Sequence, residues 1–167
     1  MTPRVAYTVG YEGTTPAALA GRLRAAGVTL VLDTRRNPTS RRVGFRRRSL
    51  ERTLSEHGVR YETWPNLGVP KKIRPLARRR TWLFDAAYRG VISRAAPDLE
   101  RLVRLVATER IALLCFELDP RECHRSRLAS ALSKRGPFLF ADLRQGNRED
   151  PDDHPVPVDV VRPQDQK

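Results

Sequence analysis

Three short apolar segments constrain the fold of this chain more than any other feature of its sequence. They are residues 5–11 (VAYTVGY), 28–32 (VTLVL) and 111–116 (IALLCF). Segments with so little polar alternation are typical of strands that are covered on both faces, as in parallel sheets. Each segment is also far shorter than the roughly 20 residues that cross a bilayer, so we expect no membrane span.

Helical patterns separate these strands. Thr15 and Pro16 have the residue types of an N-cap and a first helical position, and Gly27 ends the helix that they begin. Strands that alternate with helices predict a single α/β domain with a doubly wound, mostly parallel sheet and helices on both faces, Rossmann-like or flavodoxin-like. Further helices are predicted over about 47–57, 82–93, 97–108 and 121–135, and further strands over 59–63 and 137–141.

Two segments interrupt this alternation. Residues 33–48 are polar and basic and contain a proline and a glycine, which predicts a long loop. Residues 64–76 contain three prolines and a glycine, which argues against regular structure there. We therefore assign residues 1–145 to the α/β domain. Residues 146–167, which are rich in Pro and Asp, are assigned to a C-terminal tail that we expect to be mobile or loosely packed.

The positive charge of the chain is concentrated in one third of its length. The formal net charge is +13, and residues 35–80, here called the basic region, hold 15 Lys and Arg but only 3 Asp and Glu. The rest of the chain is nearly neutral, with 17 basic and 16 acidic residues. A general bias toward arginine would raise its content everywhere, so the location of the charge indicates an acidic partner.

The basic region predicts binding of nucleic acid or of another phosphate-bearing ligand. Guanidinium groups match phosphate oxygens, and nearby aromatic rings offer stacking surfaces for bases. A solvated basic face is the plainer alternative, in which the aromatic residues belong to the core. The candidate phosphate- or nucleic-acid-binding residues are Arg35, Ser40, Arg41, Arg42, Arg46, Arg47, Arg48, Lys71, Lys72 and, outside the region, Arg125. Further cations of the region are Arg74, Arg78, Arg79 and Arg80, and its candidate aromatic residues are Phe45, Tyr61, Trp64 and, just beyond it, Trp82.

Polar side chains follow three of the predicted strands at their carboxyl ends. The first strand delivers Glu12, the second delivers Asp33 and Arg35, and the strand over 111–116 delivers Cys115 and Glu117. Ligands of open parallel sheets bind at this edge, so we expect these side chains to converge on one cleft. The alternative is that they are merely the first polar residues after buried strands.

Cys123 and His124 are the second group of candidate catalytic residues. Asp119 and Pro120 are typical of a helix start, which places Cys123 in the first turn, where the helix dipole and neighbouring arginines favour a thiolate. The alternatives are a thiol kept neutral by nearby carboxylates and a histidine that is only packed. An enzyme of this kind acts on an anionic or nucleotide substrate through Cys123, His124, Glu117, Cys115, Glu12 and Asp33.

The spacing of the Cys, His and Gly residues favours neither a metal site nor a cofactor site. Cys115, Cys123 and His124, completed by Glu117, form a conceivable metal set, but the paired Cys-x-x-Cys motifs of structural zinc sites are missing, so no metal ligand is assigned. No glycine-rich dinucleotide loop is present, and we expect no cofactor. Two cysteines cannot form a disulfide framework, which indicates a cytoplasmic, bacterial-type protein with reduced thiols. The pattern predicts no oligomeric state.

Four motifs of the chain resemble a known family. They are residues 8–13 (TVGYEG), Asp33-x-Arg35-x-x-Pro38-x-Ser40-Arg41 with Gly44-Phe45, residues 61–68, and Cys115-x-Glu117 followed by Cys123-His124-Arg125. Together they resemble the family called domain of unknown function 488, over about residues 4–136. The resemblance implies an α/β fold and no established reaction. The motif positions are Tyr11, Glu12, Asp33, Arg35, Pro38, Ser40, Arg41, Cys115, Glu117, Cys123, His124 and Arg125.

The arginine clusters at 46–48 and 78–80 lie outside these motifs, so nucleic-acid binding inferred from them is particular to this chain. Three functions remain open at this stage. The first is a nucleic-acid-binding module, and the second is an enzyme with a thiolate and carboxylate cleft. The third is a regulatory protein whose basic face meets an acidic protein partner.

Overall fold

The computed structural model describes residues 4–77, 82–143 and 156–157. Five strands are parallel to one another, in the order β3-β2-β4-β1-β5, and the two-residue strand β6 (Val156–Pro157) pairs antiparallel with β5. Apart from β6, the predicted tail (146–167) lies outside the described residues. The parallel strands are β1 (Arg4–Gly10), β2 (Leu30–Asp33), β3 (Arg60–Thr63), β4 (Ile111–Cys115) and β5 (Phe138–Asp142).

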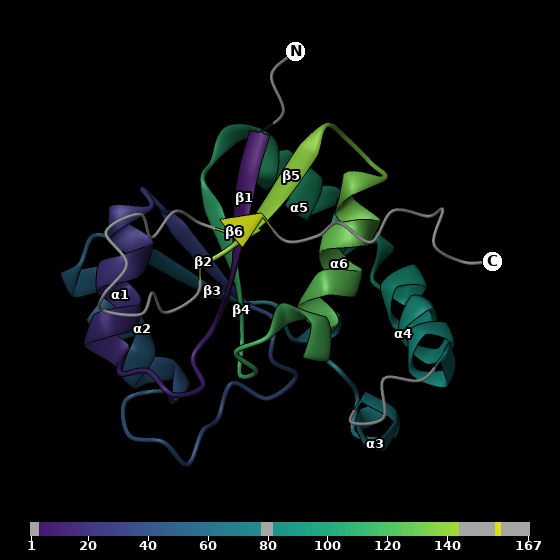
Figure 1. The fold of residues 1–167 in the computed structure, drawn as a ribbon, viewed down its shortest axis with the longest axis horizontal. Coiled ribbons are helices and arrows are strands. Elements are labelled where there is room, and N and C mark those ends of the chain that lie inside the picture. Colours follow the sequence, from purple (N-terminus) through teal and green to yellow (C-terminus); the bar gives the residue numbers. More distant parts are fainter. Residues whose placement is uncertain (1–3, 78–81, 144–155, 158–167) are drawn as a thin grey trace.

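Helices cover both faces of this sheet (Figure 1). On one face Leu19 of α1 and Leu54 of α2 pack in a core with Val31, and on the other face Leu102 of α5 packs in a core with Leu113. The predicted doubly wound α/β fold is therefore confirmed. Within the described residues, no helix is long and apolar enough to cross a membrane. The helices are α1 (Pro16–Ala25) and α2 (Arg47–Glu56) on the first face, and α4 (Trp82–Arg94), α5 (Ala96–Thr108) and α6 (His124–Ser133) on the second.

The first helix begins and ends as the sequence predicts. The Thr15 hydroxyl accepts a hydrogen bond from the Ala18 backbone N–H (3.2 Å), and Pro16 occupies the first helical position. Gly27 follows the helix with a φ of +69°, in the left-handed region that favours glycine. Local signals are therefore sufficient to define both ends of this helix.

The prediction that residues 64–76 lack regular structure is wrong in part. Pro65–Leu67 form a 3-10 turn, η1, and Arg74–Ala77 form the single-turn helix α3. Proline is compatible with the first turn of a helix, because the N–H that it lacks would have no partner there. Pro65 occupies such a position at the start of η1 and Pro75 in α3, so these prolines begin short helical turns.

The last predicted helix is interrupted near its start. Pro120–Glu122 form a 3-10 turn, η2, whose N-cap Asp119 accepts a hydrogen bond from a backbone N–H (2.8 Å). Cys123 then has an extended backbone (φ −119°, ψ 154°), and α6 begins only at His124. The prediction that Cys123 lies in the first helical turn is therefore wrong, because the turn capped by Asp119 ends one residue before it.

Strand β4 lies at the centre of the sheet, between β2 and β1. The chain leaves β1 and β2 toward helices on one face and leaves β4 toward α6 on the opposite face. Connections that diverge in this way open a crevice at the carboxyl ends of the strands, where ligands bind in open α/β sheets. The loop between β2 and α2, and helix α3, lie at this same end of the molecule (Figure 1).

Candidate functional site

A pocket of about 240 Å³ opens at the carboxyl ends of β1, β2 and β4. The ends of β4 and α6 contribute a thiol, a carboxylate and an imidazole, from Cys115, Glu117 and His124. The segment after β2 and helix α3 contribute guanidinium, amide and hydroxyl groups. These come from Arg35, Arg36, Asn37, Thr39 and Arg74. The pocket therefore combines reactive groups with hydrogen-bond donors that suit an anion.

Asp33 and Arg35 form a buried ion pair beside this pocket. The Asp33 carboxylate accepts hydrogen bonds from Nε of Arg35 (2.8 Å), from Nη2 (2.5 Å) and from the Arg35 backbone N–H (3.0 Å). The Tyr61 hydroxyl also donates to this carboxylate. Burial alone lowers the pKa of Arg35, but the contacts with Asp33 outweigh it and raise that pKa above its ordinary value. The Asp33 carboxylate is thus bound by groups of the protein itself.

Arg35 also connects the loop between β2 and α2 to the sheet through hydrogen bonds. Nη1 of Arg35 donates to the Phe45 carbonyl (2.9 Å) and to the Tyr11 hydroxyl (3.1 Å). The Phe45 ring is buried and stacks on Tyr11 at a centroid distance of 4.3 Å. Arg42 adds hydrogen bonds to the carbonyls of Tyr11 (3.1 Å) and Thr14 (3.0 Å). Phe45 is therefore a core residue and offers no stacking surface to a base.

Both cysteines and His124 come together at the end of β4. The Cys115 sulfur lies 3.8 Å and the Cys123 sulfur 3.5 Å from Nδ1 of His124, and all three residues are buried. On its other side the imidazole Nε2 lies 3.0 Å from the Thr34 hydroxyl. Glu117 Oε2 lies 3.1 Å from the Cys115 sulfur. The extended backbone of Cys123 brings these groups into one cluster, here called the thiol cluster.

Charges within the thiol cluster shift the pKa values of its members. Burial raises the pKa of Cys123, but the hydrogen bond from Cys115 and the positive charges of His124 and Arg125 outweigh it and hold that pKa well below its ordinary value. The pKa of Cys115 is well above its ordinary value, because this thiol donates to Cys123 and is buried. Burial and the negative charge of Cys123 raise the pKa of Glu117. A single thiolate, at Cys123, is therefore favoured.

Two further motif residues have structural contacts. Arg125 is fully buried, with its Nη2 donating to the Glu117 carbonyl (2.5 Å) and its Nη1 3.5 Å from Asp142 Oδ1. It does not line the pocket. Glu12 is exposed and accepts a hydrogen bond from the Leu118 backbone N–H (3.1 Å). Both residues thus hold the segment that follows β4 in place.

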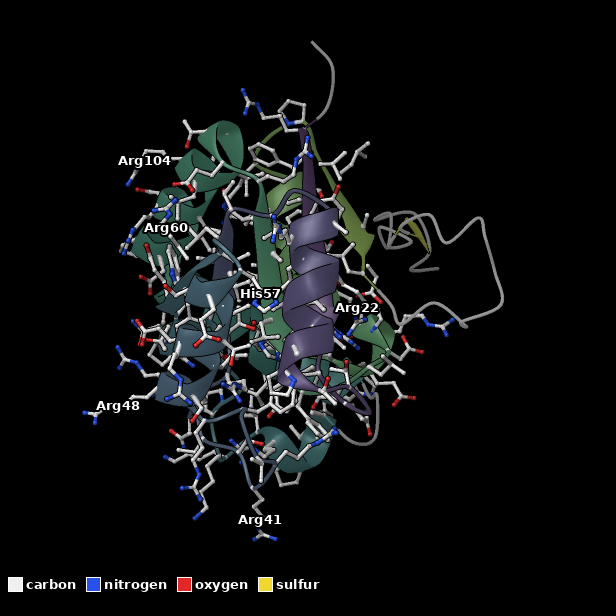
Figure 2. The ribbon with its side chains drawn as sticks, turned by 90° about the vertical axis from the view of Figure 1, so that its left-hand side faces the viewer. Arg22, Arg41, Arg48, His57, Arg60 and Arg104 are labelled. Atoms are coloured by element: carbon white, nitrogen blue, oxygen red, sulfur yellow. The ribbon has the colours of Figure 1, made fainter. Side chains whose placement is uncertain are left out.

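The remaining basic candidates surround the pocket end of the molecule. Ser40 is half-buried in a turn, where its hydroxyl accepts from the Arg42 backbone N–H (3.1 Å) and its carbonyl from Arg46 Nε (3.4 Å). Figure 2 shows Arg41 and Arg48 at one end of the molecule and Arg104 at the opposite end. Lys71 and Lys72 are exposed just before α3. The predicted cluster at 78–80 lies outside the described residues.

A family model matches most of the chain. The model described as Domain of unknown function DUF488 matches residues 15–132. This chain belongs to the DUF488 family. The resemblance seen in the sequence is confirmed. The comparison with curated proteins and the comparison with solved structures found no match.

The DUF488 fold brings some of the candidate residues together and separates others. Cys115, Glu117, Cys123 and His124 meet at the thiol cluster, whereas the Asp33 carboxylate is bound to Arg35 and Tyr61. Glu12 is exposed and is not among the residues that line the pocket. Sequence reasoning missed Thr34, because a threonine between two charged motif residues carries no signal of its contact with His124.

Proposed function

We propose that this DUF488 protein binds a phosphate-bearing ligand, with nucleic acid as the expected form, through the basic region beside the strand-end pocket. The observation that carries this proposal is a set of exposed cations at the carboxyl end of the sheet. Within the described part of the chain, their side chains make no hydrogen bond or ion pair. They are Arg41, Arg47, Arg48, Lys71, Lys72 and Arg74.

The start of α2 adds to this argument. Arg46 is the N-cap and makes no side-chain capping bond, and Arg47 and Arg48 occupy the first turn without an acidic neighbour there. Cations at this end of a helix face the positive end of the helix dipole, which is locally unfavourable. A bound phosphate is attracted both by these side chains and by the helix N-terminus. The arrangement therefore favours an anion at this surface.

The pocket offers further donors next to these cations. Arg36 and Arg74 are exposed and line it together with the Asn37 amide and the Thr39 hydroxyl. Guanidinium groups bind phosphate oxygens through paired hydrogen bonds, and neutral donors complete such sites. One phosphate group of a longer ligand can thus occupy the pocket while neighbouring phosphates contact Arg41 and α2.

Fluorescence anisotropy with labelled single-stranded RNA, single-stranded DNA and duplex DNA, over a series of salt concentrations, tests the proposal. The wild-type protein should bind at least one of them, with an affinity that falls steeply as salt rises. Replacing Arg41, Arg47 and Arg48 by serine together should weaken binding and reduce the salt slope by about one for each arginine that contacts a phosphate.

Arg104→Ser is the matched control, because Arg104 is also exposed but lies at the opposite end of the molecule (Figure 2). It should leave the affinity unchanged. Inorganic phosphate and a nucleoside monophosphate, used as competitors, distinguish a small anion in the pocket from a polymer on the surface. The proposal is wrong if none of these probes binds at low salt, or if the triple variant and Arg104→Ser have equal effects.

A second function, an enzyme that acts on the bound anion, is favoured by one specific observation. Cys115, Glu117 and His124 line the same pocket as Arg36 and Arg74, so reactive groups lie beside the anion-binding groups. In such an enzyme a thiolate is the nucleophile and a carboxylate or an imidazole transfers protons. Mass spectrometry of a bound oligonucleotide or nucleotide should then show a product. Cys123→Ser should prevent its formation, because Cys123 is the favoured thiolate of the cluster, and a bound ligand that never reacts contradicts this function.

A further inference from the structure

The thiol cluster has the composition of a metal site as well as that of a nucleophile. The two sulfurs and Nδ1 of His124 all lie within 4.8 Å of one another, and Cys115, Cys123 and His124 are all buried. At Zn–S and Zn–N bond lengths of about 2.3 and 2.0 Å, the ligand atoms of a tetrahedral zinc site lie about 3.5 Å apart. The observed sulfur-to-nitrogen distances, 3.5 and 3.8 Å, are close to this value.

The His124 ring is held in the orientation that a ligand needs. The Thr34 hydroxyl donates to the Leu114 carbonyl (2.9 Å), so toward His124 Nε2 (3.0 Å) it can only accept. In a neutral imidazole the proton is thereby placed on Nε2. A metal that displaces the second proton, carried by Nδ1 in the charged ring, would therefore meet the Nδ1 lone pair, which faces the two sulfurs. Metal-binding histidines almost always donate their other N–H to such a partner, which fixes the ring and its tautomer.

The charges around the cluster also suit a divalent cation. Two thiolates and a neutral imidazole carry a charge of −2, which a divalent ion cancels. The Glu117 carboxylate, whose Oε2 lies 3.1 Å from the Cys115 sulfur, adds a further negative group beside the cluster. Mixed thiolate and imidazole ligands are typical of zinc and of the transition metals that resemble it.

We propose that Cys115, Cys123 and His124 bind one zinc ion, or another divalent transition metal of the same preference, whose fourth position opens into the strand-end pocket. Cys115 and His124 line that pocket, and so does Glu117, which is not one of the three ligands. Three protein ligands and an open position distinguish catalytic zinc sites from closed structural ones. A metal here places a Lewis acid next to Arg36 and Arg74, where the proposed anion binds.

Metal binding and a free nucleophilic thiolate exclude each other, because the metal would use both sulfurs. The experiment therefore separates the two possibilities. The full-length protein is treated with a chelator and titrated with Co²⁺ and then with Zn²⁺. One Co²⁺ per chain should bind, with thiolate-to-cobalt charge-transfer bands in the near ultraviolet and the intense visible bands of tetrahedral cobalt. Zn²⁺ should displace it.

Variants locate the site. Cys123→Ser should lose the charge-transfer bands and weaken metal binding by more than about 100-fold, which exceeds the effect expected of a residue that only orients a ligand. His57→Gln is the matched control, because His57 contacts the Thr53 carbonyl at the C-terminal end of α2 and is not one of the three proposed ligands. Figure 2 shows His57 beside α1. The His57→Gln variant should bind cobalt like the wild type.

A measurement on the wild-type protein covers the case that Cys123→Ser does not fold. Iodoacetamide should modify both thiols of the chelator-treated protein under mild denaturation and neither thiol in the metal-loaded protein. The inference is overturned by any of three results: no stoichiometric metal, a cobalt spectrum without thiolate bands, or alkylation that metal does not slow. It does not depend on phosphate binding, since none of these measurements uses an anionic ligand.

Discussion

The Asp33 carboxylate and the Arg35 guanidinium, two residues apart in sequence, join the end of β2 to the loop that carries the first arginine cluster. Arg35 is 6% exposed and Asp33 is fully buried, so this is an internal ion pair. Through the Phe45 carbonyl the same guanidinium holds the loop just before α2. Two of the charged residues of the family motif thus position the basic surface rather than form it.

Asp33→Asn should therefore destabilise the protein strongly. The substitution leaves the buried Arg35 without its counter-charge, and breaking a buried pair in this way typically costs about 3–5 kcal/mol. Urea unfolding of the variant gives the free energy of unfolding directly. Glu109→Gln is the comparison, because Glu109 pairs with the exposed Arg60, and exposed pairs contribute about 0–1 kcal/mol. Equal losses in the two variants would contradict the structural role of Asp33.

Gly10→Ala should disturb the pocket through the backbone. A Cβ atom at Gly10 would lie 1.9 Å from the carbonyl oxygen of Glu117, so the segment after β4 must move. Such overpacking typically costs about 1–3 kcal/mol, and here it also displaces the Glu117 carboxylate. Denaturant unfolding should show the loss. In the control, Gly21→Ala in α1, the new Cβ contacts nothing within 4 Å, and stability should rise by about 0.5–1 kcal/mol.

Thr34→Val should weaken metal binding while leaving the three ligands intact. Valine has nearly the shape of threonine but cannot accept the hydrogen bond from His124 Nε2. Loss of such an orienting partner typically lowers metal affinity by about 10–100-fold. Cobalt affinity measured by competition with a metal indicator gives the change, and Thr34→Ser, which keeps the hydroxyl, should restore most of it. Failure of serine to restore the affinity would indicate that Thr34 acts only by packing.

Trp82 and Trp64 should respond differently to alanine. Trp82 is 76% exposed and lies just beyond the basic region, whereas Trp64 is buried in the core. Trp82→Ala should leave stability within about 0.5 kcal/mol of wild type. If Trp82 stacks on a base, the substitution weakens single-stranded nucleic-acid binding by about 1–3 kcal/mol. Trp64→Ala should cost about 3–5 kcal/mol of stability. Anisotropy and urea unfolding measure the two effects, and unchanged affinity in Trp82→Ala removes this residue from the interface.

The sequence was sufficient to predict the sheet because its strands are covered on both faces. Apolar runs such as residues 28–32 are typical of buried strands of a parallel sheet. The capping residues of α1 define its ends through local contacts. The ends of these strands were also predictable, which is why Cys115 and Glu117 could be assigned to the same edge as Asp33. The family resemblance rested on the same strand ends.

The contacts within that edge could not be predicted in the same way. Arg35 and Arg125 are buried, whereas an arginine in a basic sequence is ordinarily expected at the surface. The meeting of Cys123 with Cys115 depends on the short turn capped by Asp119 and on the extended backbone that follows it. These features arise from tertiary packing, so the sequence showed which residues were candidates but not which of them touch.

The position of β4 between β2 and β1 has a consequence for folding. The groups at the strand-end pocket come from segments about a hundred residues apart in the chain, and they become neighbours only when the central strand is in place. A ligand or metal bound there contacts both the first and the last parts of the domain. It therefore binds only the folded protein, in which the sheet is complete. A site of this kind stabilises the whole fold by about 2.7 kcal/mol at a ligand concentration 100 times its Kd. The melting temperature of the protein can therefore identify its natural ligand before any reaction is known.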